Sequence, residues 1–424
     1  MKTLVALAVL VTAGARTVGW DDLPPAVHAR LQNSGHTAST FPAFVSTLSR
    51  EADARVRDGD FDHLVFYILQ STHFTKLPPI EPALSAKAFA STGAVPAAAA
   101  ARVAAFLRAI DSRDADPRVK YFRALLASVP PRERRTLIER EYGRGMKFLY
   151  EKEFGDRSNT VQLYRTRGLS TDTAVEAGYA VRVGLGVLEG LDPSRRIRRV
   201  LIVGPGIDLA PRTGMLEVGP PESYQPWTVI DALVGLGLSR LDDLEVVGAD
   251  INPRVVTHLR ASRQRAPALR LVSSLAESDT VSFVLGYREY FESLGRALGS
   301  TLDESAVASG HLAKVVAVRP AAAATLRAEP LNIVTERLTG EPFDLVIATN
   351  ILPYFDGPEL LLAVTNIASM VAPGGAFMHN DTRPEVAQDA ALAGLPPEQL
   401  RQVFIATVKG APPLADTIVL HRRR

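Results

Sequence analysis

The stretch Val200-Leu201-Ile202-Val203-Gly204-Pro205-Gly206 is the strongest fold signal in the chain. Four consecutive apolar residues, ended by glycine, are typical of a short strand buried on both faces. Glycines at a strand-to-helix turn let a ligand approach backbone N–H groups that a Cβ atom would block. The stretch therefore predicts the first strand of a parallel sheet followed by a ligand-binding turn, with a plain tight turn as the alternative.

Further short apolar runs follow in the second half of the chain and alternate with helical patterns. The runs cover residues 244–249, 331–334, 343–348, 375–378, 403–408 and 417–420, and the helical patterns include 173–188, 226–238 and 358–371. Apolar strands that alternate with helices indicate a parallel sheet covered on both faces. We expect an α/β fold with a doubly wound, mostly parallel, seven-stranded sheet whose last two strands are antiparallel.

The first part of the chain has a different pattern. Residues 20–170 are rich in Ala, Leu, Arg and Glu, are interrupted by Pro and Gly, and show no alternation of period two. They predict an all-α N-terminal domain. The α/β domain is then expected over residues 171–424, with a Pro-rich insertion at 209–225 and a second insertion at about 265–330. A long loop at the ligand end of a sheet is typical of a lid or a substrate wall.

The bulk composition excludes several classes of function. The 424 residues carry a net charge of only +2, which argues against sequence-independent binding of nucleic acid. The absence of cysteine excludes disulfides and thiolate chemistry. Asp58, Asp60 and Asp62 have the spacing that begins a calcium loop, but His63 stands in place of the turn glycine. We interpret these acids as the cap of a helix that begins near His63, and no metal site is predicted.

The N-terminus has the layout of a secretory leader. Lys2 precedes an apolar run over residues 4–11, and Ala13-Gly14-Ala15 follows as a small-x-small cleavage pattern. Residues 1–15 are therefore a candidate signal peptide. The alternatives are a buried first helix and a mis-assigned start. The run is too short to remain as a transmembrane helix in the mature chain.

A single acid ends the second predicted strand. Asp250 is placed there to accept hydrogen bonds from both ribose hydroxyls of a nucleoside. The alternative is that Asp250 caps the next helix, but Asn252, directly before Pro253, can take that role instead. The third glycine of a dinucleotide fingerprint is missing, with Asp208 or Leu209 at its position. A ligand without phosphates is thus favoured over an NAD pyrophosphate.

The fourth strand region completes a set of four ordered signals. Phe343-Asp344-Leu345-Val346 leads to Asn350, and Pro373-Gly374-Gly375 follows one helix later. With the G-x-G turn and Asp250, this order resembles class I S-adenosylmethionine (SAM)-dependent methyltransferases over residues 171–424. The resemblance implies a Rossmann-like methyltransferase fold with SAM as the cofactor.

One segment narrows the resemblance within that family. Residues 350–355, Asn-Ile-Leu-Pro-Tyr-Phe, are similar to a segment of the chemotaxis-receptor glutamate methyltransferases. The second insertion and the helical domain in front also resemble theirs. The chain departs from the pattern at Pro353, at Asp208, and at Ile202, where an acid is usual. The resemblance implies a protein carboxylate as one possible methyl acceptor.

The resemblance also assigns roles to individual residues. The turn would lie against the methionine part of SAM, Asp250 would hold the ribose, Thr335 and Glu336 would lie near the adenine, and Asn350 near the sulfonium. The predicted cofactor-binding residues are Gly204, Pro205, Gly206, Asp250, Ile251, Thr335, Glu336 and Asn350. Asn350 and Tyr354 are the predicted catalytic residues.

Four more side chains are candidates for the acceptor side of the site. Tyr287 and Tyr290 could join Tyr354 in shaping an acceptor pocket, although half-buried amphipathic rings are the alternative interpretation. His379 and Asp381 follow the fifth strand, and a structural histidine is the alternative there.

The leading hypothesis is a SAM-dependent methyltransferase that acts on an unidentified small molecule or protein side chain. The alternative is a non-catalytic SAM- or nucleotide-binding or structural protein on a degenerate methyltransferase fold. A nucleotide-dependent oxidoreductase is disfavoured by the incomplete glycine fingerprint. The location follows from the function: cytoplasmic if the protein uses SAM, exported to the periplasm if residues 1–15 are cleaved.

Overall fold

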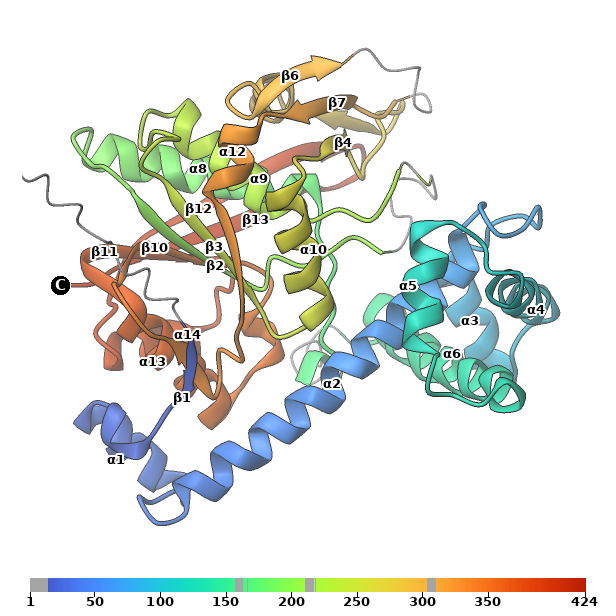
Figure 1. Ribbon diagram of the computed structural model, residues 1–424, viewed down its shortest axis with the longest axis horizontal. Helices are drawn as coiled ribbons and strands as arrows, with labels where there is room; N and C mark the ends of the chain where they lie inside the picture. Colours follow the sequence, from blue (N-terminus) through green and yellow to red (C-terminus); the bar gives the residue numbers. More distant parts are fainter. Residues whose placement is uncertain (1–13, 157–162, 166, 210–216, 218, 303–309) are drawn as a thin grey trace, which may run out of the picture.

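The computed structural model describes residues 14–156, 163–165, 167–209, 217, 219–302 and 310–424 (Figure 1). Its centre is an eight-stranded sheet of order β5-β12-β13-β11-β10-β2-β3-β8. Five neighbouring strands are parallel, and the other three pair antiparallel. The parallel strands are β2 (Arg199–Val203), β3 (Glu245–Asp250), β8 (Leu326–Pro330), β10 (Phe343–Ala348) and β11 (Val371–His379). The others are β5 (Val281–Phe283), β12 (Pro397–Val408) and β13 (Ala411–Arg422).

The sheet differs from the predicted one in two respects. It has eight strands rather than seven, because β5 adds to the free edge of β12. Its third parallel strand is β8 at residues 326–330, whereas the predicted run 331–334 is a loop that follows it. The apolar pattern misled because β8 is an edge strand with partly exposed polar side chains. Leu331 and Ile333 are buried instead by lying at the end of the sheet.

Alternate residues of each central strand pack into two separate cores, one on each face of the sheet. Val200 and Ile202 pack with α8 (Val175–Leu191), α9 (Tyr224–Gly235) and α10 (Pro253–Gln264) on one face. Leu201 and Val203 pack on the other face with α1 (Pro25–Asn33), α13 (Gly357–Met370) and α14 (Pro384–Leu392). The chain thus adopts an α/β Rossmann-like fold with helices on both faces.

Helix α2 (Phe41–Gln70) links the sheet to the remaining helices (Figure 1). Its first half packs in the same core as α1 and α13, and its second half contacts α3 (Pro82–Thr92), α4 (Ala97–Asp111) and α6 (Pro131–Phe154). Helix α5 (Pro117–Leu125) adjoins α4. Of the predicted helical region, α1 and the first half of α2 therefore pack on the sheet, and the second half of α2 lies with α3–α6 beside it.

The interpretation of the three aspartates as a helix cap is wrong. Asp58, Asp60 and Asp62 lie in the middle of α2, which begins at Phe41. Asp60 and Asp62 are buried, and Asp62 forms an ion pair with Arg144 at 3.0 Å. The acids are tolerated inside the helix because side chains from other elements neutralise them.

The start of the described chain is a short strand, β1 (Ala15–Thr17), which pairs antiparallel with β9 (Glu336–Leu338). Ala15 pairs with Leu338, so the predicted cleavage point lies in a paired strand, while residues 1–13 of the candidate leader lie outside the described residues. Among the helices that are described, none is by itself long and apolar enough to cross a membrane. The pair α3 and α4 passes that test only together, across a bend of 118°.

The second predicted insertion forms a small sheet of its own. Strands β4 (Ala268–Val272), β7 (Ala313–Val318) and β6 (Gly299–Leu302) pair antiparallel in that order. Helices α11 (Leu285–Ser293) and α12 (Pro320–Thr325) also belong to this segment, whose β5 and β8 are strands of the main sheet.

Candidate functional site

The strand order reverses between β2 and β10, and the carboxyl ends of these strands form the candidate site. A crevice opens at such a reversal because the two flanking connections leave toward opposite faces of the sheet. The turn after β2 lies there. Gly204 has φ +66° and Gly206 has φ +68°, a left-handed conformation that favours glycine. A Cβ at Gly204 would lie 2.1 Å from Cδ1 of Ile351, so the turn also packs tightly on the loop after β10.

Asp250 ends β3 beside this turn and is 6% exposed. Its Oδ1 accepts a hydrogen bond from the backbone N–H of Asn252 at 2.8 Å, and its Oδ2 accepts one from Gly206 at 3.3 Å. Burial raises the pKa of Asp250 to about 6, although the two N–H donors oppose the shift. The cap of α10 is Asn252, whose Oδ1 accepts from the backbone N–H of Arg254, so the acid is left for another role.

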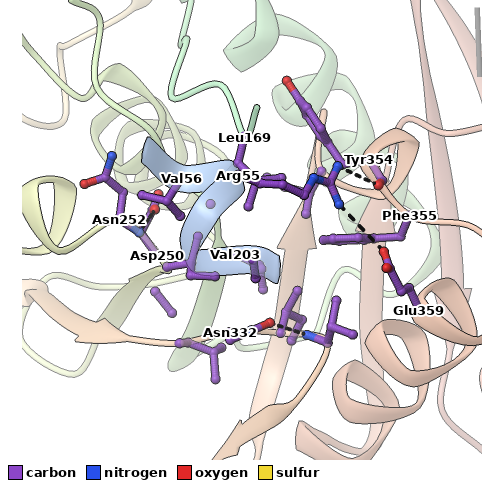
Figure 2. A pocket seen from close by; sticks show the side chains of 18 of the residues that line it. Arg55, Val56, Leu169, Val203, Asp250, Asn252, Asn332, Tyr354, Phe355 and Glu359 are labelled. Carbon is purple, nitrogen blue, oxygen red and sulfur yellow. Dashed lines mark hydrogen bonds and ion pairs between the residues drawn. The ribbon is translucent and has the colours of Figure 1, made fainter. Parts of the chain in front are cut away.

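An enclosed, largely apolar chamber lies between this acid and α2. The strand ends and the loop 331–334 form one wall, and α2 forms the opposite wall with Leu48, Ala52 and Val56. Figure 2 shows α2 crossing the chamber, with Asp250 and Asn252 on one side and Tyr354 and Glu359 on the other. The mostly apolar lining suits an uncharged ring system, and Figure 2 shows the acid at one side of the chamber.

Arg55 fastens α2 over the chamber. One of its Nη atoms donates to the carbonyl oxygen of Tyr354 at 3.0 Å, and its Nε donates to that of Arg167 at 3.2 Å. Glu359 on α13 forms an ion pair with Arg55 at 3.7 Å. Burial lowers the pKa of Arg55 and raises that of Glu359. Figure 2 shows the guanidinium directed at Tyr354 and Glu359, away from Asp250.

A backbone strap over residues 167–171 closes the chamber next to Arg55. The N–H of Leu169 donates to the carbonyl oxygen of Arg55 at 2.8 Å. A Cβ at Gly59 would lie 1.9 Å from the carbonyl oxygen of Leu169, so the strap and α2 touch backbone to backbone. The N–H of Thr171 donates to Nε2 of His63 on α2 at 3.0 Å. The strap and the helix therefore form one wall.

A second chamber, here called the polar chamber because its lining is more polar than that of the first, adjoins the first one. The two share Ser170, Gly204, Ile351 and Tyr354, so the glycine turn and the loop after β10 lie where they meet. The other lining residues of the polar chamber come from the helical segment, the strap and the start of α8, the glycine turn, α9, and the ends of β10 and β11. They are Lys152, Tyr164, Arg167, Asp172, Thr173, Ala174, Ala177, Pro205, Gln225, Thr349, Asn350, Pro353, Asp381 and Arg383.

Asn350 has an unusual backbone in this second chamber. Its φ of 60° lies in the left-handed region, where asparagine is among the few side chains that are tolerated. Its backbone N–H donates to Oδ1 of Asn380 at 2.8 Å, and Nδ2 of Asn380 donates back to Oδ1 of Asn350 at 2.8 Å. Strained residues held by such reciprocal bonds are frequent at binding and catalytic sites.

Most of the predicted site residues meet at the two chambers. Asp250 and Ile251 line the enclosed chamber, Pro205 and Asn350 line the polar one, and Gly204 and Tyr354 line both. Gly206 contacts the site through its hydrogen bond to Asp250.

Thr335 and Glu336 line neither chamber. Thr335 is fully buried and accepts a hydrogen bond from Ser49 on α2, and Glu336 accepts one from the backbone N–H of Asn332 at 2.9 Å. The chamber wall is the preceding segment, residues 331–334. The displacement follows from the misplaced third strand, because the true strand ends at Pro330.

Of the acceptor-side candidates, the two tyrosines lie away from both chambers, whereas Asp381 lines one of them. Tyr287 and Tyr290 are buried against α8, where they donate to Glu176 and to the carbonyl oxygen of Val175, and they line neither chamber. Asp381 lines the polar chamber but is paired with Arg383 at 2.6 Å.

His379 is structural. Its Nε2 lies 2.8 Å from Nε2 of His421, and its Nδ1 accepts from the backbone N–H of Asp381. His421 in turn contacts the carbonyl oxygen of Leu395 through Nδ1. This series of hydrogen bonds allows one consistent placement of the ring protons, in which both rings are neutral. Burial lowers the pKa of His379 to about 3 and also lowers that of His421.

The described part of the first insertion contacts the helical segment rather than covering Asn350. The carbonyl oxygen of Leu209 accepts from Arg118 on α5, and Glu217 accepts from Ser71 at 2.8 Å. Gln225 alone among its described residues lines the polar chamber. Residues 210–216 and 218 lie outside the described part of the chain.

Sequence reasoning missed the contribution of α2 to the site. Leu48, Ala52, Arg55 and Val56 are about 200 positions away from Asp250 in the chain. Nothing in their local pattern distinguishes a helix that covers a ligand chamber from one that covers a core. Asn332 was missed for a different reason, since its segment was taken for a strand.

No family model matches the sequence, and no curated protein sequence matches it either. Among solved structures, the chain is similar to the N-methyltransferase NodS from Bradyrhizobium japonicum in complex with S-adenosylhomocysteine (SAH), at 13% identity over 62% of this chain and 98% of that one, with a TM-score of 0.31. It is also similar to magnesium protoporphyrin IX methyltransferase from Synechocystis with bound SAM, at 11% identity over 65% and 94%, with a TM-score of 0.30. The glycopeptide N-methyltransferase MtfA with sinefungin gives 9% identity over 58% and 93%, with a TM-score of 0.31. At such identities and scores, these structures say nothing about the cofactor or acceptor of this chain.

Proposed function

We propose that the protein is a SAM-dependent methyltransferase. The observation that carries the proposal is Asp250, a buried acid beside a glycine turn, at the end of an enclosed apolar chamber. Each of its carboxylate oxygens accepts one backbone N–H, which leaves a further lone pair on each for the hydroxyls of a ribose.

We assign the two ends of the cofactor to the two chambers. The adenosine would lie in the enclosed chamber between α2 and the loop 331–334, with its ribose on Asp250. The methionine part would lie along Gly204 and Pro205, and the sulfonium near Asn350. SAM when bound supplies a methyl group on a positively charged sulfur, which leaves as a neutral thioether after transfer.

The residues of this chain then have to orient an acceptor and exclude water. The chambers join at Gly204, Ile351 and Tyr354, so an acceptor that enters the polar chamber would meet the methyl group at that junction. Orientation at near-attack distance is the main contribution a protein makes to such a displacement. Asn350 and Tyr354 are the side chains proposed to contact the reacting groups.

The direct test is calorimetric titration of the purified protein with SAM. We expect one site per chain and a loss of affinity of more than about tenfold in Asp250→Ala, because charge-assisted hydrogen bonds to a buried ligand are removed. A wild-type protein that gives no binding heat and no thermal shift with SAM would refute the proposed function.

The acceptor class proposed from the resemblance is a protein carboxylate, with a small molecule as the alternative. A methyl ester of a carboxylate is released as methanol in alkali, whereas N-methyl groups are stable. Incubation of labelled SAM with extracts, followed by separation of protein from small molecules and then by alkaline release, distinguishes a protein methyl ester from the alternatives. Label that is transferred but stable to alkali would exclude the carboxylate.

A second candidate is a non-catalytic protein that binds SAM or a nucleotide. The contacts of Arg55 with Tyr354 and Glu359 favour it, because they hold α2 over the chamber and would slow the release of a bound ligand. Binding of SAM without transfer to any fraction of an extract, combined with slow dissociation, would support this candidate over the enzyme.

A further inference from the structure

Asp60 on α2 is an acid that the proposed function does not use. It is fully buried, at 0% exposure, in the second half of the helix. Its Oδ1 accepts hydrogen bonds from the hydroxyl of Tyr121 at 2.7 Å and from Nδ2 of Asn252 at 3.0 Å, and its Oδ2 accepts one from Arg254 at 2.5 Å. A buried carboxylate with three donors is a fixed charge, held by α5, by the loop after β3 and by α10.

Asn252 connects this charge to the proposed ribose acid. Its Nδ2 donates to Asp60, its Oδ1 caps α10 by accepting from the N–H of Arg254, and its own N–H donates to Asp250 at 2.8 Å. Because both ends of the amide are engaged, its orientation is determined and it cannot flip. Movement of Asp60 would therefore move the N–H that holds Asp250.

We propose that Asp60 is a positioning residue for the cofactor: through Asn252 and Arg254 it holds the loop that carries Asp250, and its charge acts on that acid. This inference rests on the proposed function of Asp250 as the ribose ligand. In this role α2 not only encloses the chamber but also sets the position of Asp250 on its opposite side.

The charge of Asp60 has a consequence of its own. It adds to burial in raising the pKa of Asp250, whereas the N–H donors of Asn252 and Gly206 lower it. Arg254 is the cation that faces Asp60 in this cluster, and it also lies over the ring of Tyr121 at 5.3 Å. A ribose requires the ionised acid, so cofactor affinity is expected to fall as the pH drops through about 6, the pKa of Asp250.

The experiment measures the dissociation constant of SAH from pH 5 to 8 in three variants. In Asp60→Asn, we expect affinity at pH 8 to fall by about tenfold, because the position of the loop is loosened. The pH midpoint of binding should at the same time move down by roughly 0.5–1 unit, because a like charge is removed. A variant with the affinity and the midpoint of the wild type would overturn the proposal.

Two further variants separate charge from packing. Arg254→Gln breaks the same cluster but keeps the charge of Asp60, so its midpoint should not fall. A fall as large as in Asp60→Asn would mean that loosened packing causes the shift, which would overturn the role of the charge. Asp62→Asn is the matched control, since Asp62 is also buried in α2 but pairs with Arg144 and Arg167. We expect the wild-type midpoint there, and circular dichroism verifies that each variant is folded.

A readout without cofactor keeps this inference distinct from the proposed function. The carboxyl carbon of Asp250 can be titrated by NMR in the ligand-free protein, and Asp60→Asn should lower its pKa. If wild type binds no SAH at any pH, the proposed function fails while the NMR titration still tests the link between the two acids. An unchanged pKa of Asp250 in Asp60→Asn would refute that link.

Discussion

Replacing Asp250 by asparagine should make the ligand-free protein more stable at neutral pH while it removes cofactor binding. The acid is buried in an apolar chamber, and burial is the largest cause of its raised pKa. A residue that is retained at a cost to stability is expected where the charge serves a ligand. Asparagine has nearly the same shape, so the substitution removes the charge and leaves the packing.

The magnitude follows from the two pKa values of Asp250. A shift from 3.8 to about 6 corresponds to a cost of ~3 kcal/mol for the ionised acid in the folded state. Asparagine can accept only one of the two backbone N–H bonds, and the bond from Gly206 at 3.3 Å is the longer of the two. The loss of that bond costs ~1 kcal/mol. The free energy of unfolding should therefore rise by about 2 kcal/mol at pH 7.5.

The stability difference between Asp250→Asn and the wild type should depend on pH. Because the folded pKa lies above the unfolded one, the unfolded chain loses its proton first as the pH rises. The wild type is thus penalised progressively between pH 3.8 and about 6, and fully above that range. The advantage of Asp250→Asn should be present at pH 7.5 and absent near pH 4.

Urea unfolding at both pH values, with SAM titration at pH 7.5, is the assay. Asp279→Asn serves as the control because Asp279 is exposed, and it should change neither quantity. A variant less stable than the wild type at pH 7.5, with the same pH dependence, would refute the reasoning. So would a variant that keeps wild-type affinity for SAM.

Three other substitutions test the architecture around the site. Gly206→Ala should lower the free energy of unfolding by more than about 1 kcal/mol, since φ is +68° and the new Cβ would lie 2.2 Å from a backbone oxygen. As a control in the same urea assay, Gly186→Ala should raise it by ~0.5–1 kcal/mol, because Gly186 lies on α8 with open space around it. The free energy of unfolding should fall by up to about 1.4 kcal/mol per pH unit as the pH drops below 6.5. The reason is that the buried ring of His379, whose folded pKa is about 3, stays neutral while the same ring in the unfolded chain takes up a proton. In unfolding curves of His379→Gln, the free energy of unfolding should depend less steeply on pH. Arg55→Gln should speed dissociation of SAM by roughly tenfold in stopped-flow measurements, because the charge-assisted bond to the carbonyl of Tyr354 is weakened, and an unchanged rate would exclude a clasp.

Local sequence patterns were sufficient for the central part of the fold. The run 200–203 is apolar throughout, the run 343–348 is apolar except for Asp344, and both are central parallel strands with a core on each face. The glycine turn and Asp250 followed directly, because a turn that needs a left-handed backbone and an acid at a strand end are local features.

The edges of the sheet could not be predicted in the same way. Strand β8 has a mixed pattern because its side chains are partly exposed and Arg327 pairs with Glu245 of the neighbouring strand. Leu331, Ile333 and Val334 resembled a strand more closely, although they are loop residues buried in the same core as the first half of α2. A hydrophobic run reports burial, and burial alone does not distinguish a strand from a loop at the end of a sheet.

The α/β layering, the glycine turn and the acid beside it follow from local sequence, because each depends on residues within one strand and the turn after it. The elements that enclose the turn come from distant parts of the chain. Asp60 and Arg55 reach the site because α2 lies across the ends of β2 and β3, and His379 is withdrawn from it by its pairing with His421. Such contacts join residues tens to hundreds of positions apart, and their free energy depends on desolvation and on partners that no local pattern contains.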